Sequence, residues 1–174
     1  SLQDVLYKND VSWTPLKEAV PNFGFSSSAY WLKVDLACSP ELGSKKILVI
    51  NYPLLDSIEV SAVVDHQVVY TNHTGDMIPF SQRPVKHHHF LFYLPDFQNR
   101  ASLYIRVQTQ SAAQIPVQLF TQEGFSEYNQ KTLLIQGCYF GIILAMILYN
   151  LFLFFSVREN YYLLYVFFTI SYFC

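Results

Sequence analysis

Charged residues are almost absent from the last 43 positions of this 174-residue chain. Of the 24 Asp, Glu, Lys and Arg residues, 22 fall within residues 1–131, and only Arg158 and Glu159 follow. A stretch with so few charges has the composition of a segment that is surrounded by lipid. The chain therefore divides into a water-compatible part and an apolar part that we expect to enter a membrane.

Other features are scarce as well, and each scarcity excludes a class of protein. Lys and Arg total 11 against 13 Asp and Glu, so no basic stripe exists to bind nucleic acid. Cys38 is the only cysteine before the apolar part, which excludes a disulfide within the first part. The chain contains no G-x-S-x-G motif, phosphate-binding loop or evident acidic pair. We therefore expect no catalysis and no cofactor in this chain.

The apolar part predicts transmembrane helices. Residues 132–157 carry no charge for 26 positions, which is about 39 Å of helix against a hydrocarbon core of about 30 Å. A second apolar run over residues 161–174 would cover only about 21 Å, less than one crossing. We expect one complete helix, a tight turn, and the start of an antiparallel second helix in a chain that continues further.

The complete helix carries two signs of packing against other helices. Gly137, Gly141 and Ala145 recur every four residues, a pattern that lets a second backbone come close. Asn150 lies roughly 180° around the helix from Gly141, and lipid cannot satisfy its amide. These residues predict a bundle with partners on two sides, unless the pattern is a chance occurrence in a single anchor.

Residues 1–125 read as short β-strands separated by turns. Around residue 30, Tyr30, Leu32, Val34 and Leu36 alternate with Trp31, Lys33 and Asp35, the pattern of a half-buried strand. Similar runs occur at Ile47 to Tyr52, Ile58 to Val64, Phe90 to Leu94, Leu103 to Val107, and Ile115 to Leu119. We predict an all-β, antiparallel jelly-roll sandwich over residues 1–125, then a short connector at 126–131 and the helices.

Trp31 is the first candidate for ligand binding. It shares a strand face with Lys33 and Asp35, whereas a core tryptophan would follow Leu32 and Val34. An aromatic ring among polar neighbours can stack on a sugar while those neighbours bond its hydroxyls. The alternative is that both faces of the sheet are covered and Trp31 is ordinary packing.

A second group of candidates surrounds the Pro79 to Pro84 stretch. Arg83 is held between prolines, and it could clamp a carboxylate or sugar, or brace the loop against a backbone carbonyl. His87 and His89 would share one face of a strand, with His88 on the other. Together with Asp76 they could bind zinc, but the same pattern also fits a polar sheet face whose imidazoles bond to neighbours.

A series of motifs in order then resembles one known pattern. It consists of Tyr30-Trp31-Leu32, Tyr52-Pro53-Leu54-Leu55-Asp56, Ile58-Glu59-Val60, Thr74-Gly75-Asp76, and Pro79-Phe80-Ser81-Gln82-Arg83-Pro84-Val85 leading to His87-x-His89-Phe90. The series resembles the type 2 extracellular domain of bacterial seven-transmembrane receptors with diverse intracellular signalling modules. The apolar tail is similar to the start of the seven-helix region of that family.

The resemblance implies a periplasmic jelly-roll sensor that binds carbohydrate-like ligands, seven helices in the bacterial inner membrane, and a cytoplasmic output such as a histidine kinase or diguanylate cyclase. It also places residues 1–131 in the periplasm and Arg158 inside. From family motif and strand face together we predict a carbohydrate or small-molecule site at Trp31, Asp76, Arg83, His87 and His89. Two alternatives stay open. The sandwich could bind a second copy or a partner sensor, or it could be a membrane-anchored hydrolase using a metal with Asp76 and the histidines.

Overall fold

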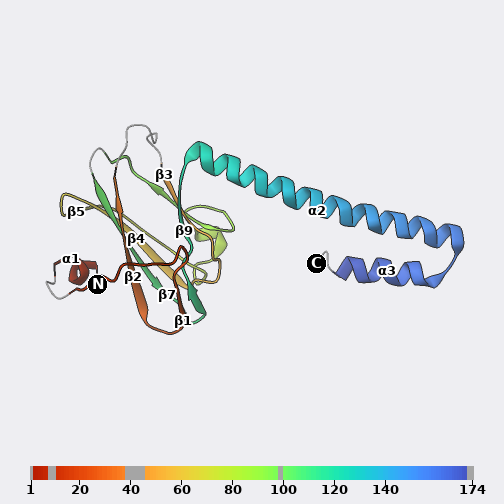
Figure 1. The fold of residues 1–174 in the computed structure, drawn as a ribbon, viewed down its shortest axis with the longest axis horizontal. Coiled ribbons are helices and arrows are strands. Elements are labelled where there is room, and N and C mark those ends of the chain that lie inside the picture. The colour runs from red at the N-terminus through yellow and green to blue at the C-terminus, as the bar shows by residue number, and fades with distance from the viewer. Residues whose placement is uncertain (1, 8–10, 38–45, 98–99, 172–174) are drawn as a thin grey trace. The chain divides into compact units, whose positions relative to one another are not determined.

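The computed structural model describes residues 2–7, 11–37, 46–97 and 100–171. The chain separates into two compact units, Ser1–Glu123 and Gly124–Cys174. The first unit consists mostly of antiparallel β-sheets and the second of helices (Figure 1). The predicted order of a sandwich followed by apolar helices is therefore confirmed.

Two antiparallel sheets form the body of the first unit, with strand orders β2-β7-β4-β5 and β6-β3-β9, and a small sheet pairs β1 with β8. In chain order the elements are α1 (Leu2–Tyr7), β1 (Asn22–Phe25), β2 (Ala29–Leu36), β3 (Lys46–Ile50), β4 (Ser57–Val64), β5 (Gln67–Thr74), η2 (Phe80–Gln82), β6 (Phe90–Leu94), β7 (Ala101–Gln108), β8 (Ala112–Gln114) and β9 (Val117–Thr121).

The hydrophobic core lies between the two larger sheets. Along β7, the buried residues Leu103, Ile105 and Val107 alternate with half-buried residues, as a period of two requires. Phe90 and Phe92 of β6 join the same core cluster from the other sheet. Each such side chain contributes about 1.5–3 kcal/mol by leaving water, so this cluster holds the sheets together.

The expected single strand from Ile115 to Leu119 is wrong. β8 ends at Gln114 and pairs with β1, and β9 begins only at Val117 and pairs with β3. Pro116 lies between them, and proline has no amide hydrogen to donate to a sheet. Further elements were not anticipated, among them α1, β1 and β5. Asp65 and His66 join β4 to β5 with φ angles of 48° and 63°, values that suit a tight hairpin turn.

The second unit contains α2 (Gln122–Val157) and α3 (Asn160–Ser171). By length and composition α2 is apolar enough to cross a membrane. Residues 126–131, which we expected as a connector, form part of this helix. Arg158 ends α2 with a φ of 60°, and its N–H donates to the Phe154 carbonyl at 2.8 Å. Figure 1 shows α3 turning back in the opposite direction.

The predicted packing residues lie on two faces of α2. Gly137, Gly141 and Ala145 are exposed, and a Cβ atom added at either glycine would meet no atom within 4 Å. Asn150 lies seven residues after the buried Ile143 and therefore on the same side of the helix. Its Nδ2 atom donates to the Met146 carbonyl at 2.8 Å, so the helix itself satisfies part of that amide. A second helix on the small-residue face stays a prediction.

Candidate functional site

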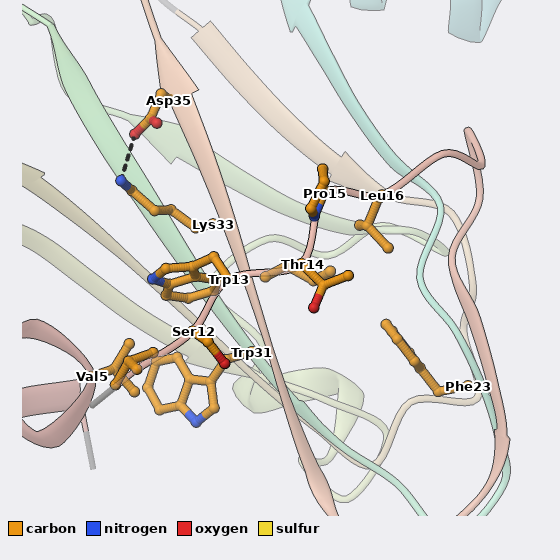
Figure 2. A pocket seen from close by; sticks show the side chains of 12 residues that line it. Val5, Ser12, Trp13, Thr14, Pro15, Leu16, Phe23, Trp31, Lys33 and Asp35 are labelled. Carbon is orange, nitrogen blue, oxygen red and sulfur yellow. Dashed lines mark ion pairs between the residues drawn. The ribbon is translucent and has the colours of Figure 1, made fainter. Parts of the chain in front are cut away.

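A cleft lies on the outer face of the four-stranded sheet. Because Leu32 points into the core, Trp31, Lys33 and Asp35 of β2 point outward. The ring centroid of Trp13 lies 6.0 Å from that of Tyr104 on β7, so the N-terminal segment packs against this face. Between the segment and the sheet is a cavity of about 680 Å³ (Figure 2). Its other lining residues are Val5, Val11, Ser12, Thr14, Pro15, Leu16, Phe23 and Leu32.

Both tryptophans of the chain line this one cavity. Trp31 is half-buried on the sheet, and Trp13 is 41% exposed on the opposing segment. Figure 2 shows both indoles among the side chains that surround the cavity. Two large, flat, partly accessible rings offer apolar surface on which another ring can stack.

Charged and polar groups flank the indoles. Lys33 Nζ lies 3.3 Å from Asp35 Oδ1, and the Ser102 hydroxyl donates to the same oxygen at 2.6 Å. The hydrogen bond from Ser102, with a further contribution from Lys33, holds the pKa of Asp35 below its ordinary value against the opposing effect of partial burial. Asp35 is therefore a hydrogen-bond acceptor beside the indoles, with Lys33 as its cationic partner.

Of the five predicted site residues, only Trp31 is among the described residues that line this cleft. Asp76, Arg83, His87 and His89 lie elsewhere on the sandwich. Arg83 Nη2 lies 3.4 Å from Asp76 Oδ1, and Arg83 Nε donates to the Ile78 carbonyl at 3.5 Å. The guanidinium also lies 5.0 Å from the ring centroid of Phe90. These contacts correspond to the bracing role that the sequence left open for Arg83.

The expected alternation of the three histidines is wrong. Strand β6 begins only at Phe90, and His87 to His89 form a bend before it. The His89 N–H donates to His87 Nδ1 at 3.1 Å, and the ring centroids of His88 and His89 lie 3.8 Å apart. The three imidazoles therefore contact one another. Within the part of the chain that the structure describes, no group of three His, Cys, Asp or Glu side chains is placed to hold a metal ion.

Stability is expected to fall as this cluster is acidified. Burial, together with repulsion from His88 and His87, lowers the pKa of His89 to about 4. Between pH 6.5 and pH 4 the unfolded chain binds this proton and the folded chain does not, so the free energy of unfolding decreases over that window. Because His89 is partly exposed, we expect a loss of only about 1 kcal/mol.

Thermal unfolding followed between pH 4 and pH 7 measures this loss. The variant His89→Gln should show a shallower decline than the native chain, because glutamine carries no titratable group. Lys86→Gln, on the same loop, should follow the native curve. Parallel curves for His89→Gln and the native chain would contradict the assignment.

Comparison with protein families agrees with this architecture. Residues 1–121 match the family described as 7TMR-DISM extracellular 2, and residues 132–174 match 7TM diverse intracellular signalling. The first match alone covers more than half of the chain. The chain belongs to the 7TMR-DISM extracellular 2 family. No curated protein matches it.

The 7TMR-DISM chain is therefore part of a transmembrane signalling receptor, with an extracellular sensor domain followed by the start of its membrane region. Several motifs that carry the family resemblance meet at one end of the sandwich. Asp76 N–H donates to the Leu55 carbonyl at 2.8 Å, and Asp56 Oδ2 accepts the N–H of Gln110 at 2.8 Å. The Ser111 hydroxyl donates to the Leu54 carbonyl at 2.7 Å. These motif residues connect three loops of the 7TMR-DISM sensor.

Sequence reasoning missed Trp13, Tyr104 and the N-terminal wall of the cleft. Tyr104 alternates with the core residues of β7, which identifies its face but not what covers that face. Trp13 stands between Ser12 and Thr14 in a stretch without apolar periodicity. A single large aromatic residue flanked by Ser12 and Thr14 was the available signal.

Proposed function

We propose that this chain is the ligand-sensing part of a bacterial receptor and that a carbohydrate-like ligand binds in the cleft between β2 and the N-terminal segment. The observation that carries the proposal is that both tryptophans line one cavity beside the Lys33 and Asp35 ion pair. A sugar presents apolar ring faces and hydroxyl edges, which match indoles and fixed polar groups respectively. The chain would have no catalytic activity of its own.

Signalling needs only that the ligand binds one arrangement of the receptor more tightly than another. The cleft suits this purpose because its two walls come from different parts of the chain. One wall is the sheet face of β2, and the other includes Val5 of α1, a helix with no buried residues. A ligand that contacts both walls would fix the position of the N-terminal segment. The bias would pass through inner-membrane helices to a cytoplasmic output domain, with the sandwich in the periplasm.

A protein partner, either a second copy or another sensor, is the second candidate. The large apolar side chains of Leu54, Met77 and Phe80 are exposed at 53%, 79% and 53% on the loops that join the strands. Exposed apolar side chains of this kind can mark an interaction surface when they form one patch. The concave cleft with fixed polar groups favours the small ligand.

Intrinsic fluorescence tests the proposed function directly, because the chain contains only two tryptophans and both line the cleft. The full chain in lipid nanodiscs is titrated with a panel of mono- and disaccharides. We expect a saturable change in tryptophan emission. Trp31→Ala should raise the Kd for the saccharide at least about 30-fold. This change corresponds to about 2 kcal/mol of binding free energy, the amount that a central aromatic contact contributes.

Trp31→Phe is the matched control, because it keeps an aromatic face for stacking while removing the same fluorophore. It should bind more tightly than Trp31→Ala, with Trp13 reporting in both variants. Unfolding midpoints show that the variants are folded. If no saccharide changes the emission, or if Trp31→Ala binds as tightly as the native chain, the cleft is not a carbohydrate site.

A further inference from the structure

A second cavity lies beside the tryptophan cleft on the same outer sheet face. Its volume is about 420 Å³. Tyr104 and Ser102 of β7 contribute to its floor, and Arg100 precedes that strand. Asp65 and His66 line it from the turn between β4 and β5. Unlike the tryptophan cleft, this cavity is surrounded mainly by polar side chains.

The two cavities share their walls. Lys33 lines both of them, and α1 contributes Val5 to the tryptophan cleft and Tyr7 to the second cavity. The Tyr7 hydroxyl donates to the His66 carbonyl at 3.5 Å, which connects α1 to the far side of the second cavity. Alternate residues of β2 lie about 7 Å apart, so Trp31 and Lys33 face consecutive parts of one extended site.

Hydrogen-bond donors predominate in the second cavity. Among its described lining residues, the permanent cations Lys33 and Arg100 stand against one carboxylate, Asp65. The nearby Asp35 carboxylate already accepts from Ser102 and pairs with Lys33. The Tyr104 hydroxyl is a further donor. A ligand group that fills this cavity should therefore be an acceptor with negative charge.

We infer that the ligand is an acidic saccharide whose ring stacks in the tryptophan cleft and whose carboxylate enters the second cavity beside Lys33 and Arg100. The inference rests on the proposed function and names its ligand class. Arg100 is exposed and offers a planar fork that matches a carboxylate, a group that a neutral sugar lacks.

Matched pairs of ligands test the inference on the full chain in nanodiscs. Disaccharides ending in glucuronate, galacturonate or sialate are compared with neutral disaccharides of the same linkage, with tryptophan emission as the readout. We expect at least one acid to bind about 10-fold more tightly than its neutral counterpart, the preference that a charge-assisted pair provides. Added salt should reduce that preference.

Arg100→Gln should remove the preference for the acid over the neutral sugar, and Arg100→Glu should reverse it. Lys86→Gln is the matched control, because it removes one positive charge from a loop that does not line either cavity. If neutral sugars bind as tightly as acids, or if Arg100→Gln keeps the preference, the inference is overturned and the proposed function stands. If neither class changes the emission, both are overturned.

Discussion

Replacing Gly75 with alanine is expected to lower the free energy of unfolding of the sandwich by about 2–4 kcal/mol. A Cβ atom at this position would lie 2.7 Å from the carbonyl carbon of Asp56 and 2.9 Å from the Cα of Ser57. Both are backbone atoms that cannot move aside without moving β4. The adjacent N–H of Met77 donates to the Asp56 carbonyl at 3.3 Å, so the loop cannot retreat without losing hydrogen bonds.

Gly24→Ala is the matched control for this prediction. Gly24 has a φ of 70°, and a Cβ atom there would meet nothing within 4 Å. Its replacement should therefore cost only the strain of a left-handed backbone, about 1–2 kcal/mol. Denaturant unfolding followed by tryptophan emission compares the two, because Trp13 and Trp31 both lie in the first unit. Equal losses in the two variants would show that the close approach at Gly75 does not limit stability.

Of the family motifs, Tyr30-Trp31-Leu32 reaches the cleft, whereas the motifs around Gly75 hold loops together. Gly75 and Asp76 lie against the Leu55 and Asp56 backbone, and Arg83 holds its own loop through Ile78. These motifs therefore specify how the loops at one end of the sandwich fit together.

Most of the sandwich could be predicted from alternation because each core strand buries one face. Leu103, Ile105 and Val107 are buried as the period of two requires. The prediction was wrong where local chemistry interrupts the period. Pro116 lies in the gap between β8 and β9, so that β9 begins only at Val117, and the histidines bend before β6 begins. Alternation reports which face a side chain occupies only while the backbone stays extended.

The candidate site was predictable only in part. Trp31 could be placed on an outward face from its neighbours Lys33 and Asp35, and the structure places it in the cleft. The opposing wall could not be predicted, because the segment around Trp13 has no period and contacts β7 about 90 residues further along the chain. Sequence pattern describes neighbours along a strand, whereas this cleft depends on a distant contact.

Phe92→Ala is expected to cost about 3–5 kcal/mol of the stability of the sandwich, the range for removing a large aromatic side chain from a core. Phe92 is 1% exposed and lies in the core cluster that both large sheets share. It pairs with Leu48 of β3, the central strand of its sheet, which holds the backbone of β6 in place on that side. The removed ring should therefore leave a cavity that the fold cannot fill by local collapse.

Tyr93→Ala tests the register as well as the core. Tyr93 is the next residue of β6, points to the opposite face, and is 53% exposed, so its loss should cost less than about 1 kcal/mol. A shift of one residue in the pairing of β6 with β3 would exchange the two faces, and the larger loss would then fall on Tyr93→Ala. Unfolding followed by tryptophan emission separates the two outcomes, because only the observed register makes Phe92 the costly position.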